Sequence, residues 1–178
     1  MSKKFLQKIF IKRSPFPFNL SKLSGIDTVN VLANINSNDD LKGLELFIKN
    51  FNENYPQSKF NNYLYYSDNE IPIYVDNSII LNDYIKNEKS RSIKKSIKLF
   101  INNEKINSDL LIFFNPNYFS PINYLLKYIH TESCIGIGSE EYQNYFQLYF
   151  IINEYQEINT IFDTLNKLKR NNYEHKTI

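Results

Sequence analysis

The chain has 178 residues, 42% of them hydrophobic and 22% charged, which excludes a disordered chain and predicts one folded domain. The net charge of +2 excludes a polycation, and the single cysteine, Cys134, excludes an internal disulfide. Because we find no secretory signal and no apolar run of about 18 residues, we expect a cytoplasmic protein without a transmembrane segment.

Residues 1–26 are expected to form a basic N-terminal arm, since they hold six lysines and arginines and no acid. Phe5, Leu6, Ile9 and Phe10 have helical spacing, so residues 1–13 predict a short amphipathic segment. Four interpretations remain open. The segment packs on the domain with its lysines in water, touches RNA, contacts a membrane surface peripherally, or serves as an organelle presequence.

A single domain is predicted over residues 27–170, followed by a frayed tail over 171–178. In its first half, apolar runs predict strands and an apolar stripe with helical spacing predicts a helix. The expected elements are a strand at 28–33, a polar loop at 34–38, a helix capped by Asp39 and Asp40 and ending before Pro56, a strand at 62–66, a strand or turn at 78–81, and a basic helix at about 90–102.

The second half begins with a continuous apolar run over 110–114, which predicts a central strand covered on both faces. Ser120 followed by Pro121 indicates a capped helix with Ile122, Leu125, Leu126 and Ile129 inward. Further strands are expected at 133–137 and 146–152, and a last helix from about 158 to 170. This alternation predicts an α/β fold: a three-layer α/β/α sandwich with a mostly parallel sheet, Rossmann- or flavodoxin-like.

The run from Asp109 to Ile152 resembles the core of an uncharacterised family of small bacterial α/β proteins. The resemblance rests on a strand DLLI, a helix carrying PI, and a strand ending in IG, with matches at Asp109, Leu110, Leu111, Ile112, Pro121, Gly136 and Ser139. Members of that family carry a Lys-Lys-Asp and Trp segment where this chain has SIILNDY, without tryptophan. The resemblance implies the fold and a cytosolic bacterial setting, and it implies no activity.

The residues that usually carry chemistry are few. His130, at a helix end, and His175, in the tail, are the only histidines, and neither has an acid or nucleophile placed beside it by the sequence. With Cys134 they do not form a zinc pattern, and Cys134 lies inside an apolar strand, where we expect an inert thiol. The sequence therefore predicts no catalytic residue, no metal site and no cofactor, and favours a binding or scaffold protein over an enzyme.

Gly136-Ile137-Gly138-Ser139 is the one glycine-rich stretch that could approach a phosphate. Glu141 stands where the dinucleotide pattern has its third glycine, and Glu140 lies beside it. Two carboxylates there repel a phosphate, so we interpret the stretch as a plain tight turn.

Open α/β sheets bind ligands at the carboxyl ends of their strands, here expected at 34–38, 67–70, 115–118 and 138–141. Asn115, Asn117 and Ser139 are the candidate ligand-binding residues of these segments. They suggest an enzyme-like domain or a ligand sensor that binds a small molecule, and by fold analogy a nucleotide sugar.

The leading hypothesis rests on a basic face instead. Arg91, Lys94, Lys95 and Lys98 follow i, i+3, i+4 and i+7 spacing on the helix expected at 90–102. Such a face fits RNA phosphates, so we expect association with RNA or a ribonucleoprotein through this face and the N-terminal arm. A solvated surface helix in a lysine-rich chain has the same pattern.

Overall fold

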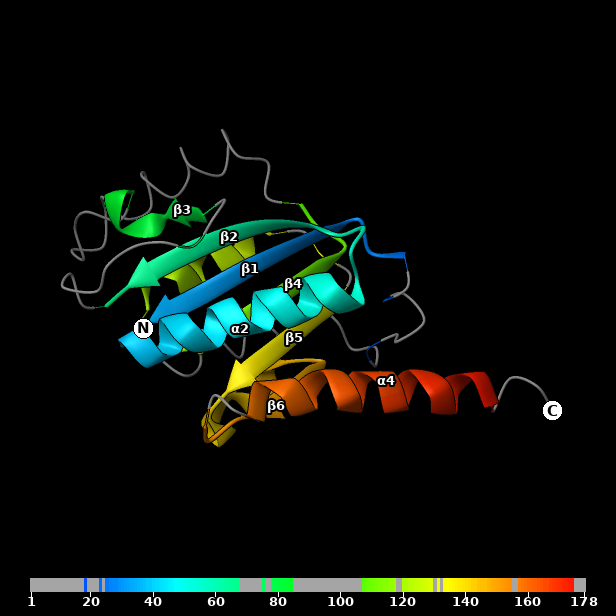
Figure 1. Cartoon of the computed structure of the whole chain (residues 1–178). Helices are drawn as coiled ribbons and strands as arrows, with labels where there is room; N and C mark the ends of the chain where they lie inside the picture. Colours follow the sequence, from blue (N-terminus) through cyan, green and yellow to red (C-terminus); the bar gives the residue numbers. More distant parts are fainter. Residues whose placement is uncertain are drawn as a thin grey trace.

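A six-stranded sheet forms the centre of the structure, a computed structural model that describes residues 18, 23, 25–67, 75, 78–84, 107–117, 120–129, 131, 133–154 and 157–174. The strands are β1 (Thr28–Ile35), β2 (Lys59–Tyr66), β3 (Ser78–Ile80), β4 (Leu110–Phe114), β5 (Ser133–Gly138) and β6 (Leu148–Ile151). Their order is β3-β2-β1-β4-β5-β6, and every neighbouring pair is parallel (Figure 1). The predicted α/β class is confirmed, and this order is that of the Rossmann fold.

The two central strands, β1 and β4, pair in register from Val29 with Leu110 to Ala33 with Phe114. All five residues of β4 are fully buried, as a strand covered on both faces requires. The bounds of β4 match the predicted strand residue for residue.

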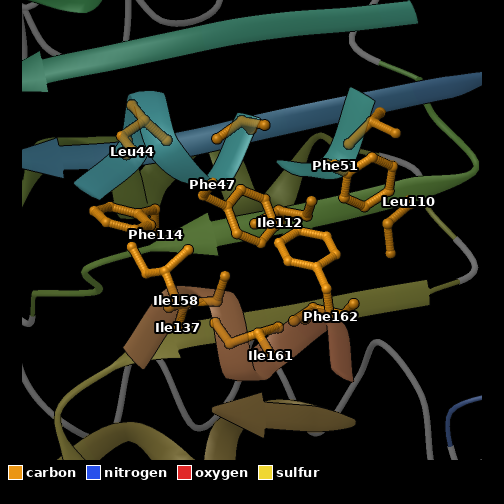
Figure 2. Packing of buried hydrophobic residues seen from close by; sticks show 14 of the residues in the cluster. Leu44, Phe47, Phe51, Leu110, Ile112, Phe114, Ile137, Ile158, Ile161 and Phe162 are labelled. Carbon is orange, nitrogen blue, oxygen red and sulfur yellow. The ribbon is translucent and has the colours of Figure 1, made fainter. Parts of the chain in front are cut away.

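One face of the sheet carries the two long helices, α2 (Asn38–Asn54) and α4 (Ile158–Glu174), which lie side by side (Figure 1). Phe47 of α2 packs against Phe162 of α4, with ring centroids 5.3 Å apart, and both rings lie near Ile112 of β4 (Figure 2). Burial of each such side chain contributes about 1.5–3 kcal/mol, so this face anchors both helices to the sheet.

The other face is covered by short 3-10 helices: η2 (Leu81–Asp83), η3 (Pro121–Lys127) and η4 (Glu140–Tyr145). The predicted cap and buried face of the helix after Ser120 are confirmed, because Ser120 accepts from the Ile122 amide and Ile122, Leu125, Leu126 and Ile129 are all buried. The segment forms a 3-10 helix rather than an α-helix. The sequence does not separate the two types, because apolar residues at i and i+3 suit both. That α-helices cover both faces remains a prediction.

Several predicted boundaries were wrong by a few residues. The polar loop expected at 34–38 begins later, because Asn34 and Ile35 continue β1, and Ser37 rather than Asp39 or Asp40 caps α2. The remaining differences are that β2 starts at Lys59, β3 ends at Ile80, β5 includes Gly138, and β6 spans only Leu148–Ile151.

The chain ends differ from the expected domain limits as well. Leu23 and Ile26, which fall in the predicted arm, are buried in the same hydrophobic core as the inner faces of α2 and α4. At the other end α4 continues to Glu174, past the expected start of the tail.

The chain leaves β1 and β4 toward opposite faces of the sheet. After β1 it enters α2 on the face shared with α4, and after β4 it enters η3 on the other face. Adjacent strands whose connections diverge in this way form a topological switch point, where open α/β sheets bind ligands.

Candidate ligand site at the carboxyl ends of the strands

Two asparagines join β1 and β4 at the switch point. Asn34 Nδ2 donates to the Asn115 carbonyl at 2.9 Å, and Asn115 Nδ2 donates to the Asn34 carbonyl at 3.2 Å. Asn34 is fully buried, and its Oδ1 has no hydrogen-bond partner among the described residues. A buried amide oxygen left without a donor is costly, so a further donor at this position would stabilise the pair.

Asn115 has an unusual backbone. Its φ is 51°, which places it in the left-handed region, where asparagine is among the few side chains tolerated. Its amide donates to the Ile137 carbonyl at 2.7 Å, so the end of β4 is held against β5. The left-handed turn redirects the chain toward η3 immediately after the strand.

The structure brings the three predicted ligand residues to one edge of the sheet. The Ser139 carbonyl accepts from the Tyr149 hydroxyl at 2.8 Å, and the Asn117 carbonyl accepts from Asn123 Nδ2 at 2.6 Å. Asn117 and Ser139 therefore close the loops after β4 and β5 through their backbones. Among the three, Asn115 is the one whose side chain takes part in the switch-point pair.

The turn from β1 into α2 stands where a Rossmann protein binds the pyrophosphate. Here Asp40 Oδ2 accepts from the Asn36 amide at 2.8 Å, while Ser37 Oγ accepts from the Asp40 amide at 3.1 Å. Asp40 is buried, so a carboxylate of the chain itself holds an amide that a phosphate would otherwise use. The arrangement favours a closed turn over a phosphate cradle.

Gly136 and Gly138 have packing reasons of their own. A Cβ on Gly136 would lie 2.3 Å from Tyr149 Cδ2 and 2.6 Å from Phe146 Cδ2. A Cβ on Gly138 would lie 2.9 Å from Pro116 Cδ. Both glycines belong to β5 rather than to a turn, and they make room for aromatic rings and for the loop after β4.

Carboxylates gather at this edge of the sheet. The segments after β1, β5 and β6 hold six acids, Asp39, Asp40, Glu140, Glu141, Glu154 and Glu157. The one cation in the described residues of these segments, Lys42, lies 3.4 Å from Asp39 Oδ1. We call residues 34–42, 67, 115–117, 138–141, 152–154 and 157 the carboxyl edge; it is acidic and rich in amides.

At the opposite side of the sheet, where β1 and β4 begin, Asp109 connects the two strands by hydrogen bonds. Its Oδ2 accepts from the amides of Asp27 and Thr28, at 3.1 and 2.9 Å, and from Thr28 Oγ1 at 2.9 Å. The hydrogen bond from the Thr28 amide is the largest cause of a lowered pKa for the Asp109 carboxyl. The first residue of the DLLI motif therefore joins β4 to the start of β1.

A groove of about 870 Å³ lies elsewhere on the described surface, between α2 and the first half of β2. Ile48, Phe60 and Val75 line it together with the charged side chains of Glu45, Lys49, Glu53 and Lys59. It shares no residue with the carboxyl edge.

Several predicted residues cannot be placed. Arg91, Lys94, Lys95 and Lys98, the N-terminal segment 1–13, and both His130 and His175 lie outside the described residues. Cys134 is buried in β5, as expected. Within the described part of the chain, no three His, Cys, Asp or Glu side chains converge as metal ligands, and no helix is long and apolar enough to cross a membrane.

Sequence reasoning placed Asn34 at this edge, within the segment 34–38, but did not single it out as a binding residue. It was assigned to a loop because it interrupts the apolar run of residues 28–33. A signal was present, since Asn30 and Asn34 follow the strand's period of two and both are fully buried on the face opposite α2. Asparagines at such spacing inside a strand indicate buried polar positions.

The comparisons with known proteins add no relative. No family model, no curated protein and no solved structure matches the chain. The geometry of the described residues is therefore the basis for a functional proposal.

Proposed function

We propose that this protein binds a small polar molecule at the carboxyl edge of its sheet and does so without catalysis. The observation that carries the proposal is the fully buried Asn34, whose Oδ1 has no partner among the described residues at a topological switch point. Unsatisfied groups and left-handed residues persist where a structure serves binding as well as stability. At the switch point itself the polar groups are those of Asn34 and Asn115, and amides and carbonyls bind ligands but do not transfer protons near neutral pH, which favours binding over acid–base chemistry.

The proposal is tested by NMR titration of the ¹⁵N-labelled chain with small polar molecules grouped as cations, anions and neutral polyols. We expect at least one group to shift the amide signals of Asn34, Asn36 and Asn115 while leaving those of Asp27 and Thr28, at the opposite edge, in place. The variant Asn34→Leu should abolish the shifts. Saturating ligands that move no carboxyl-edge signal would refute the site.

A second function, association with nucleic acid, is supported by how the charge divides along the chain. The described residues hold 7 lysines and arginines and 13 acids, a net charge of −6, whereas the remaining residues hold 14 and 6, a net charge of +8. The overall +2 therefore hides basic segments at 1–22 and 85–106 that RNA phosphates would attract.

This second function has a matched test in fluorescence polarisation with a 20-nucleotide RNA. Neutralising Arg91, Lys94, Lys95 and Lys98 with glutamine should weaken binding and flatten its salt dependence by up to about four counterions. The control neutralises four lysines of the described body, Lys42, Lys49, Lys59 and Lys167. Equal losses in both variants would show that only net charge matters and would remove the assignment to this helix.

A further inference from the structure

We infer that the ligand of the carboxyl edge is an organic cation that donates N–H hydrogen bonds, such as an alkylammonium compound. This inference rests on the proposed binding function and adds the chemical class of its ligand. Three features of the edge carry it: its charge, the acceptor at its centre, and the closed turn after β1.

The charge of the carboxyl edge attracts cations. Six carboxylates and one lysine give its described residues a net charge of −5. The acids come from three separate connections, those after β1, β5 and β6, whose strand ends share this edge of the sheet. A surface with this excess of negative charge attracts a cation and repels an anion.

The centre of the edge offers an acceptor rather than a donor. The Nδ2 of Asn34 is used by the Asn115 carbonyl, whereas its Oδ1 has no partner among the described residues. This second observation is independent of the acids, since Asn34 is uncharged and fully buried. An ammonium group has three donors and no acceptor, so it matches this oxygen.

The turn after β1 disfavours the alternative ligand, an anion. The Asn36 amide donates to Asp40 and the Asp40 amide donates to Ser37. An anion would have to displace the Asp40 carboxylate from the start of α2, and two like charges would then lie together. A cation meets no such competition.

The experiment is isothermal titration of the full chain with spermidine, and with glucose and ADP as neutral and anionic probes. We expect one spermidine per chain, with affinity about tenfold weaker in the double variant Glu140→Gln/Glu141→Gln and lost in Asn34→Leu. The matched control, Glu53→Gln/Asp163→Asn, removes the same charge from the exposed surfaces of α2 and α4 and should leave affinity within about twofold.

Each other outcome overturns the inference in a recognisable way. Equal weakening by the control variant would mean non-specific screening of the acidic body. Binding of glucose or ADP that depends on Asn34, without binding of spermidine, would refute the cation and retain the proposed site. Absence of binding by spermidine refutes the cation, and the NMR titration then decides separately whether the site itself survives.

Discussion

The two ends of the central strand pair, β1 and β4, are joined by polar side chains in different ways. At the amino end, Asp109 Oδ2 accepts three hydrogen bonds from Asp27 and Thr28, and its own amide donates back to Thr28. At the carboxyl end, Asn34 and Asn115 exchange two bonds but leave Asn34 Oδ1 without a partner among the described residues. The amino end is therefore closed by the chain's own hydrogen bonds, whereas the carboxyl end keeps a partnerless acceptor, the one that we propose a ligand uses.

The largest loss of stability is expected from a substitution at Gly136, which tests whether the glycines of β5 are needed for packing. Gly136→Ala places a Cβ within 2.6 Å of three aromatic ring atoms, two from Tyr149 and one from Phe146, so we expect a loss of about 2 kcal/mol in the free energy of unfolding. Urea denaturation at an unchanged m-value measures it. The control is Gly25→Ala, where a Cβ meets nothing within 4 Å and stability should be unaffected. Equal stability of the two variants would contradict the packing argument.

The second largest loss of stability is expected at the amino ends of β1 and β4. Asp109→Asn keeps the shape but removes the charge that accepts from Thr28 and Asp27, so we expect a loss of about 1.5 kcal/mol, moderated by the exposure of the carboxylate. The control Asp163→Asn changes an exposed acid on α4 and should cost little. Ligand binding at the carboxyl edge should be the same in both variants; a weaker affinity in Asp109→Asn alone would break the division between the two ends.

The lowered pKa of Asp109 implies that its contribution to the free energy of unfolding falls at low pH. Because hydrogen bonds lower the pKa of Asp109 in the folded chain, its contribution is complete above its ordinary pKa of about 3.8 and disappears as pH falls through the lower, folded value. The stability difference between the wild type and Asp109→Asn should therefore be constant from pH 7 to about 5 and shrink below pH 4. A difference that persists at the lowest pH would mean that geometry rather than charge stabilises this end.

The sequence predicts the middle of each element better than its ends and its neighbours. β4 was predicted to the residue because five consecutive apolar side chains, Leu110–Phe114, need cover on both faces. The end of β1 was missed because Asn34 is polar, although pairing with Tyr65 of β2 keeps it in the strand. Strand order and the meeting of Asn34 with Asn115, 81 residues away, depend on tertiary packing that local patterns do not encode.

A smaller difference in stability should distinguish the role of the Asn115 backbone from that of its side chain. Asn115→Gly and Asn115→Ala both remove the bond to the Asn34 carbonyl, but only alanine is strained at a φ of 51°. We expect alanine to be about 1 kcal/mol less stable than glycine in urea denaturation. If the two are equally stable, the loop after β4 relaxes and the left-handed conformation is not part of the edge.

The smallest effect on stability should accompany the largest effect on binding. Asn34→Leu removes one hydrogen bond to the Asn115 carbonyl, but it also removes the partnerless Oδ1 and adds apolar atoms on the face of the sheet that carries Leu32 and Phe113. The lost hydrogen bond and the removed unsatisfied oxygen offset each other, so the free energy of unfolding should change by less than about 1 kcal/mol. If the acceptor serves a ligand, the spermidine affinity measured by calorimetry should nevertheless disappear. A variant that is several kcal/mol less stable would place Asn34 with Asp109 among the residues that close the fold, and the contrast between the two ends would no longer hold.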